Sequence, residues 1–176
     1  MEEKQRKLTN KIICAITGKN IAKIGNGASE TYYKNIDIKH AILEKASELI
    51  ESGVTDFMVN AEYGFPLWAA EILLGLRDIR LQQGLPSFRL HIVMPHEEQA
   101  ADWSDDIHER FYAVHEKADE VLILYRQYHD KCHENCERFM IDNCHILLTD
   151  DDTTFAAQYA EVHKKQIFVC ESLART

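Results

Sequence analysis

The chain has 176 residues, of which 45% are hydrophobic and 28% are charged, and its formal net charge at neutral pH is −9. This length suits one domain with a buried core, and the composition excludes a disordered chain. The longest apolar runs fall far short of the about 20 residues that a membrane span needs, so we expect no membrane partner. The negative charge opposes a phosphate backbone, so we also predict no general nucleic-acid binding.

We predict a single domain over residues 1–176, with a flexible N-terminal segment over residues 1–10. The first ten residues are followed by only a short apolar run, which does not suit a secretory signal. The chain has five cysteines, an odd number that does not indicate a disulfide framework. Reduced thiols and a cytoplasmic location are therefore expected, and a homo-oligomer is left open.

Strand and helix patterns alternate along the chain. Residues 11–17 form a β-branched apolar run that predicts a first, central strand. Ser29 suits the N-cap of a helix that ends near Gly53, and Pro95 is expected to close the third strand. The remaining strands are predicted over residues 56–60, 88–94, 120–125, 145–149 and 166–170, and the remaining helices over residues 66–83, 96–118 with a break near Ser104, 132–143 and 153–164.

This alternation predicts an α/β fold with one doubly wound, mainly parallel sheet and helices on both faces. Ligands of such sheets bind beyond the carboxyl ends of the strands. One loop at that edge stands out, because Pro66 suits a first helical position while Gly64 and Phe65 offer no side-chain oxygen as a cap. We therefore predict an open helix N-terminus for a phosphate or carboxylate. The structural alternative is that water or Glu62 caps this end.

The loops at the carboxyl edge supply the candidate ligand-binding residues. They are Thr17, Gly18, Asn60, Glu62, Tyr63, Gly64, Trp68, Pro95, Arg126 and Asp150. The aromatic members could line a pocket or stack on a ring. Arg126 is the only cation at these loops apart from Lys19 and Lys23 of the first loop, so it is the cation expected to meet a phosphate. Glu62 and Asp150 could do acid–base work in a closed pocket, although carboxylates at loop tips are more often solvated.

The segment YHDKCHENC places His129, Cys132, His133 and Cys136 within eight residues, and His129, Cys132 and Cys136 could share one side of a helix. Thiolate and imidazole are ligands that zinc favours. Structural zinc sites usually bring two short-spaced pairs from turns, a spacing that this segment lacks. We predict that these side chains pack or are exposed without a metal, and that no metal cofactor is present.

Several segments resemble the YpsA-like proteins of the SLOG superfamily. They are Ala15–Gly18, Gly64–Glu71, Met94–Pro95, Ala118–Glu120 and Glu137–Asp142, of which Leu67–Glu71 (LWAAE) is the most specific. The resemblance extends over nearly the whole chain. It implies a Rossmann-like fold and a pocket for a nucleotide or a nucleotide-derived ligand, with no settled reaction.

Two loops depart from the family pattern. The loop after the second strand, Asn60–Pro66, has one glycine and lacks the usual serine and acid, and Asp150–Asp152 replaces a turn that is often rich in glycine. Both changes disfavour a phosphate. The first hypothesis is a small-molecule binding domain for a nucleotide or nucleotide-derived ligand, with a regulatory or sensing role. The alternatives are a protein-interaction module with a degenerate pocket and a nucleotide-processing hydrolase, although the Pro-Gly-Gly-x-Gly-Thr-x-x-Glu segment of base-removing relatives is absent.

Overall fold

The computed structural model describes residues 11–20 and 29–171. Strands and helices alternate as β1 (Ile13–Ile16), α2 (Tyr33–Glu51), β2 (Asp56–Val59), α3 (Phe65–Gln82), β3 (Arg89–His96), α4 (Asp105–Lys117), β4 (Glu120–Tyr125), α5 (Cys132–Asp142), β5 (Ile146–Thr149), α6 (Phe155–Val162) and β6 (Gln166–Val169). The predicted flexible segment 1–10 and the loop cation Lys23 lie outside the described residues. The predicted alternation of strands and helices is confirmed.

The strands form one 6-stranded sheet in the order β4-β3-β2-β1-β5-β6, and all neighbouring strands run parallel. The chain moves outward from β1 to β4, then returns to place β5 on the other side of β1. The strand order therefore reverses between β1 and β5, which is where ligands of doubly wound sheets bind. The predicted α/β class and parallel sheet are confirmed.

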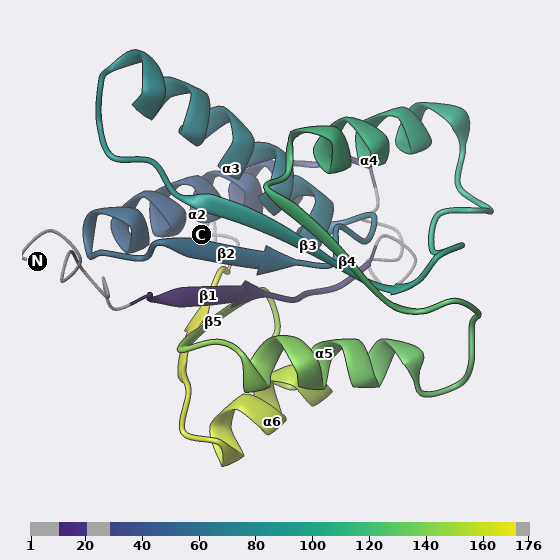
Figure 1. Cartoon of the computed structure of the whole chain (residues 1–176). Helices are drawn as coiled ribbons and strands as arrows, with labels where there is room; N and C mark the ends of the chain where they lie inside the picture. Colours follow the sequence, from purple (N-terminus) through teal and green to yellow (C-terminus); the bar gives the residue numbers. More distant parts are fainter. Residues whose placement is uncertain (1–10, 21–28, 172–176) are drawn as a thin grey trace, which may run out of the picture.

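Helices cover both faces of the sheet (Figure 1): α2, α3 and α4 lie on one face, and α5 and α6 lie on the other. Successive side chains of a strand point to opposite faces of the sheet. Cys14 and Ile16 therefore pack in the core beneath α2, α3 and α4, and Ala15 packs in the core beneath α5 and α6. All three side chains are fully buried. This double coverage explains why the first strand is a continuous apolar run rather than an alternating one.

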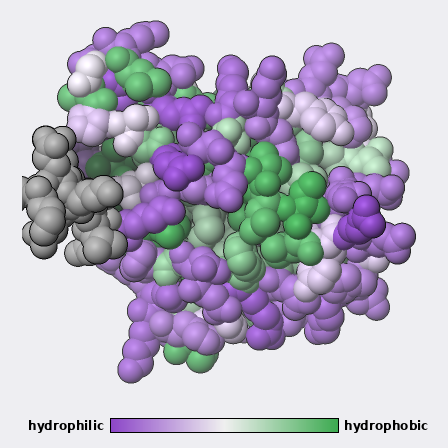
Figure 2. Space-filling model, in the orientation of Figure 1, coloured by the Kyte–Doolittle hydropathy of each residue, from purple (hydrophilic) through white to green (hydrophobic). Residues whose placement is uncertain are grey.

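One edge of the sheet is exposed and apolar. Strand β4 forms this edge, and Val121, Leu122 and Ile123 are 40%, 37% and 44% exposed. Figure 2 shows a hydrophobic patch over β4 in the same orientation as Figure 1. Among the described residues, no helix combines the length and apolarity needed to cross a membrane.

The structure corrects three predicted element boundaries. Residues 97–103, predicted as the first part of a helix over residues 96–118, form turns, and the helix α4 begins only after Ser104. Helix α2 begins at Tyr33, and Ser29 is not its N-cap; the Ser29 carbonyl instead accepts a hydrogen bond from Asn35 Nδ2 (2.7 Å). Strand β3 continues through Pro95 to His96 rather than ending before the proline. Because β2 ends opposite Ile92, β3 continues beside β4 alone, and β2 does not need the amide that Pro95 lacks.

Candidate functional site

The start of α3 is closed by the chain's own backbone. Phe65 N donates to the Lys19 carbonyl (3.1 Å), Leu67 N donates to the Glu62 carbonyl (3.0 Å), and Trp68 N donates to the Gly64 carbonyl (3.0 Å). The prediction of free amides at this helix end is therefore wrong. Sequence near α3 supplies no capping side chain, but the segment that follows β1 folds against it and supplies a carbonyl from a distant position.

Two glycines make this arrangement possible. Gly64 has a φ of 129°, a conformation that L side chains rarely adopt, and it forms an antiparallel bridge with Asn20. A Cβ atom on Gly18 would lie 2.4 Å from Cδ1 of Phe65 and 2.7 Å from Oδ1 of Asp150. Both glycines thus serve contacts within the protein, whether or not a ligand also approaches them.

A cavity of about 300 Å³ opens beyond the carboxyl ends of β1 and β2, on the side of the sheet that α5 and α6 cover. This size lies at the lower end of the range for small-molecule sites. Its lining residues are Gly18, Asn20, Asn60, Glu62, His133, Glu134, Glu137 and Phe155. The cavity lies beside the reversal of strand order, as expected for this sheet class.

Among the described residues, the cavity lining carries three carboxylates and no lysine or arginine. Glu62 is held in place by two hydrogen bonds, because its backbone N donates to Asn60 Oδ1 (3.1 Å) and its Oε1 accepts from Asn20 Nδ2 (3.2 Å). Hydrogen bonds from Arg138 and Lys131 lower the pKa of Glu134, so this group stays ionised. Lys131 and Arg138 offset the charge of Glu134, so Glu62 and Glu137 supply the negative charge that disfavours an anionic group.

Two aspartates that follow β5 accept hydrogen bonds from backbone amides that could otherwise bind a phosphate. Asp150 Oδ1 accepts from Lys19 N (3.0 Å), and Asp151 Oδ1 accepts from Thr153 N (2.8 Å). The ammonium of Lys19 pairs with Asp151 Oδ2 (3.3 Å). Burial raises the pKa of Asp150, although the Lys19 amide acts in the opposite direction. These carboxylates satisfy the loop internally.

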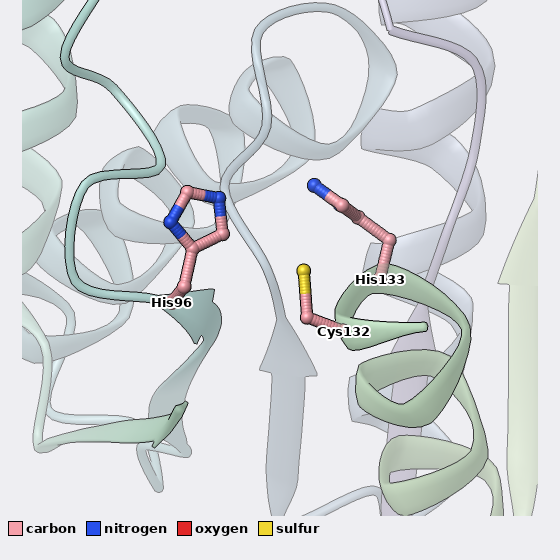
Figure 3. Close-up of side chains that lie close together, drawn as sticks. All are labelled: His96, Cys132 and His133. Carbon is pink, nitrogen blue, oxygen red and sulfur yellow. The ribbon is translucent and has the colours of Figure 1, made fainter. Parts of the chain in front are cut away.

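A second group of side chains lies next to the cavity (Figure 3). His96 ends β3, Cys132 and His133 begin α5, and one potential ligand atom from each lies within 4.8 Å of the other two. His96 and Cys132 are buried and His133 is partly buried. Burial, followed by the nearby His133, lowers the pKa of His96, which favours its neutral form.

This group differs from the one that the sequence suggested. Of His129, Cys132 and Cys136, only Cys132 belongs to it. His129 Nδ1 accepts a hydrogen bond from Lys131 N (3.3 Å), and Cys136 Sγ donates to the Val93 carbonyl (3.3 Å) on the sheet. His129 and Cys136 are close to Cys132 in the sequence, but their side chains contact other groups. His96 is distant in the sequence, and the pairing of the sheet with α5 brings it to Cys132 and His133.

Comparison with known proteins places this fold and cavity in a family. The YpsA model, described as the YspA SLOG family, matches residues 14–168. The chain belongs to the YpsA family of SLOG proteins. A UPF0398 protein of Halalkalibacterium halodurans is 29% identical over 134 residues, which cover 73% of this chain and 68% of that protein.

A UPF0398 protein of Staphylococcus epidermidis is 24% identical over 153 residues, which cover 82% of this chain and 77% of that protein. One of Bacillus cereus is 29% identical over 115 residues, covering 65% of this chain and 57% of that protein. Membership of the SLOG family suggests a nucleotide-related binding domain. The names of these relatives give no activity.

Only part of the predicted residue set lines the cavity of this SLOG domain: Gly18, Asn60 and Glu62. The others lie elsewhere. Thr17 and Trp68 are each 1% exposed, and Pro95 is buried in β3. Tyr63 packs beside Trp103 and Arg110 on the opposite face of the sheet. Gly64 forms a backbone bridge with Asn20, and Asp150 accepts a hydrogen bond from the Lys19 amide. The Arg126 side chain is 92% exposed, and its Nε lies 4.0 Å from Glu97 Oε1.

Sequence reasoning missed the cavity residues that come from helices. His133, Glu134 and Glu137 belong to the first turns of α5, and Phe155 begins α6. The spacing of His133 and Glu137 (i, i+4) and of Glu134 and Glu137 (i, i+3) predicts one shared side of a helix. Each crossover helix starts at the carboxyl edge of the sheet, so this spacing was the available signal.

Proposed function

We propose that this domain binds a nucleotide-derived small molecule in the cavity beside β1, β2 and α5, with a regulatory or sensing role. The observation that carries the proposal is a cavity at the reversal of strand order whose lining is rich in carboxylate and amide oxygens. Ribose hydroxyls and base amino groups are donors that Glu62 and Glu137 would accept. Phe155 adds an apolar wall beside which a base would pack, while Arg138 lies over its ring, 4.9 Å from the centroid.

The charge of the cavity supports a nucleoside or another ligand without phosphate groups. The part of the lining that the structure describes includes no lysine or arginine, and the amides and ammonium nearby already bind Asp150 and Asp151. A phosphate there would meet the carboxylates of Glu62 and Glu137, and the nearby cations Lys131 and Arg138 already pair with Glu134. We therefore expect the ligand to enter by its base and sugar, and we expect added phosphates to weaken binding.

A thermal-shift screen tests both parts of the proposal. A ligand that binds only the folded state raises the melting temperature by mass action, and a concentration of 100 Kd stabilises by about 2.7 kcal/mol. We expect nucleosides and their uncharged derivatives to raise the melting temperature more than the matching mono- and triphosphates. No shift from any nucleoside or nucleotide at millimolar concentration would contradict the proposed function, and a larger shift from the phosphates would contradict the charge argument.

Matched glutamate variants locate the binding site. Glu137 lines the cavity, whereas Glu161 lies on the exposed side of α6 and outside the lining. Removal of a charged hydrogen-bond acceptor costs about 1.5–3 kcal/mol, so Glu137→Ala should weaken binding roughly 10-fold to 100-fold. Glu161→Ala should leave binding unchanged. Equal effects of the two variants would place the ligand elsewhere.

A second candidate function, a protein-interaction module, is favoured by the exposed edge strand β4. Its unpaired backbone groups and apolar side chains provide a surface for strand pairing. An antiparallel pair of two copies centred on Ile123 would place Glu120 of one copy opposite Arg126 of the other, so the charges would be complementary. This candidate predicts a homodimer by light scattering that Leu122→Lys dissociates. A monomer at all concentrations would exclude this pairing.

A cytoplasmic location is part of the main proposal. All five cysteines are free and buried, an arrangement that suits a reducing compartment.

A further inference from the structure

Two imidazoles and a thiol converge beside the cavity, from the end of β3 and the start of α5 (Figure 3). We propose that His96, Cys132 and His133 bind a divalent transition metal, for which zinc is the best match. The proposal goes beyond ligand binding by the cavity, and it stands or falls on metal binding measured without any nucleoside.

The donor set selects the metal. A thiolate sulfur and two imidazole nitrogens suit zinc and other borderline transition metals, whereas magnesium and calcium prefer oxygen ligands. Zinc bound by three protein ligands keeps a fourth position for water or for a donor atom of another molecule. The three residues therefore match an open zinc site better than a closed structural one.

The distances fit this assignment after a small contraction. Bonds of about 2.3 Å to sulfur and about 2.0–2.1 Å to nitrogen separate the ligand atoms of a tetrahedral zinc site by about 3.4–3.6 Å. Here the ligand atoms lie within 4.8 Å of one another. Rotations of side chains suffice to close the difference, because rotation about the Cβ–Cγ bond of His96 presents either ring nitrogen to Cys132 and His133.

The surroundings of the three residues favour ligation over an internal hydrogen bond. His96 is only 8% exposed, and its Nδ1, which points away from Cys132 and His133 in Figure 3, has no hydrogen-bond partner among the described residues. Rotation of the ring about the Cβ–Cγ bond would turn this nitrogen toward Cys132. A buried polar atom without a partner costs free energy and calls for an explanation. The ring of His96 is also enclosed, because the Tyr128 ring packs edge-on against it at 5.6 Å between centroids and the His133 ring lies at 5.8 Å.

His133 connects the metal site to the cavity. It belongs to the proposed ligand set and also lines the cavity, which supplies a route by which a metal ion enters. When the ion binds, the Cys132 thiol loses its proton to solvent and the thiolate sulfur bonds to the metal. The bound ion would add positive charge to a wall that also carries Glu62, Glu134 and Glu137.

Metal content and spectroscopy test the proposal with untagged full-length protein. The protein is stripped with a chelator, loaded with Zn²⁺, passed through a desalting column and analysed for zinc, and a parallel sample receives Co²⁺. We expect one zinc per chain and, with cobalt, a thiolate-to-metal charge-transfer band. Loss of a residue that only hydrogen-bonds to a metal ligand typically lowers metal affinity by about 10–100-fold. His133 is a proposed ligand itself, so His133→Gln should lower the zinc affinity by at least about 100-fold.

Matched variants separate the proposed group from its neighbours. His133 and His129 lie in the same loop-to-helix segment, but only His133 belongs to the group. His129→Gln should therefore keep the zinc affinity of the wild type. Cys132→Ala should abolish the charge-transfer band, and circular dichroism confirms that each variant is folded. If Cys132→Ala fails to fold, His133→Gln still decides the outcome, because His133 is only partly buried.

Three results would overturn the proposal: zinc at background level after desalting, zinc affinity unchanged in His133→Gln, or a cobalt spectrum without the thiolate band. Each of these results leaves the nucleoside screen unaffected, so failure of the metal site is distinguishable from failure of the cavity.

Discussion

The replacement of Gly18 by alanine tests the closure of the α3 start most directly. Alanine would place its Cβ 2.4 Å from Cδ1 and 2.8 Å from Cγ of Phe65, and 2.7 Å from Oδ1 of Asp150, whereas ordinary contacts are 3.4–4 Å. Phe65 is fully buried and its backbone N is hydrogen-bonded to Lys19, so the ring has little room to move. Asp150 can yield only by weakening its bond to the Lys19 amide.

These contacts set the expected magnitude. Overpacking in a buried region costs about 1–3 kcal/mol, and a hydrogen bond to a charged group contributes about 1.5–3 kcal/mol. Because the two responses are alternatives, we expect Gly18→Ala to lower the free energy of unfolding by about 2–3 kcal/mol. Gly75 is the matched control: it lies within α3, and an added Cβ there would meet no atom within 4 Å. Gly75→Ala should raise the free energy of unfolding by about 0.5–1 kcal/mol.

Urea denaturation followed by circular dichroism measures both variants against the wild type, with the slope checked for constancy. The same chemical change should thus have opposite signs at the two positions. The reasoning is refuted if Gly18→Ala unfolds within about 0.5 kcal/mol of the wild type, which is the range of a neutral surface change.

Three further predictions concern ion pairs and thiols. Arg110 of α4 binds Glu71 of α3 (2.7 Å) and Glu30 of the turn before α2 (2.6 Å). Arg110→Met should therefore cost about 1–2 kcal/mol in urea denaturation at pH 7, after allowance for partial exposure. Hydrogen bonds from Arg110 lower the pKa of Glu30 to about 2. The ion pair therefore stabilises the fold above the ordinary pKa of 4.5, and this stabilisation is lost as the pH falls toward 2. A loss of stability in Arg110→Met that does not change with pH would contradict this reasoning. Burial alone would raise the pKa of Asp56, but hydrogen bonds, chiefly from His91 Nε2 (2.6 Å), leave this pKa lowered. Asp56→Ala should therefore lower the free energy of unfolding by about 1–3 kcal/mol at pH 7, measured by thermal and urea unfolding. An unchanged stability would contradict a stabilising role of these hydrogen bonds. All five thiols are buried, so a thiol reagent should modify the metal-free native protein only as fast as it opens, and rapid labelling before unfolding would contradict the burial.

Local sequence patterns were sufficient for the elements of the fold. Buried positions repeat along a helix with the period of that element, whereas a strand that is covered on both faces is a continuous apolar run. The apolar residues of α3 and of β1 follow these two patterns, so each segment indicates its own secondary structure. The boundary errors arose where a neighbour decided the outcome. Strand β3 passes through Pro95 because β4 extends farther than β2, and no local pattern carries the length of a neighbouring strand.

The candidate site required more than local patterns. Gly18, Asn60 and Glu62 were predicted because the carboxyl edge of a parallel sheet gathers its loops, which is a general property of the fold. Tyr63 follows Glu62 directly but points to the opposite face, since a turn redirects each side chain in a way that its residue type does not specify.

The sequence by itself determined the α/β class, the alternation of strands and helices, the likeness to SLOG proteins and the edge of the sheet where the cavity lies. The tertiary structure alone decided that the Lys19 carbonyl closes α3, that α5 contributes carboxylates to the cavity, and that His96 meets Cys132 and His133. Periodic burial is encoded residue by residue, whereas these contacts join segments that only the packed sheet brings together.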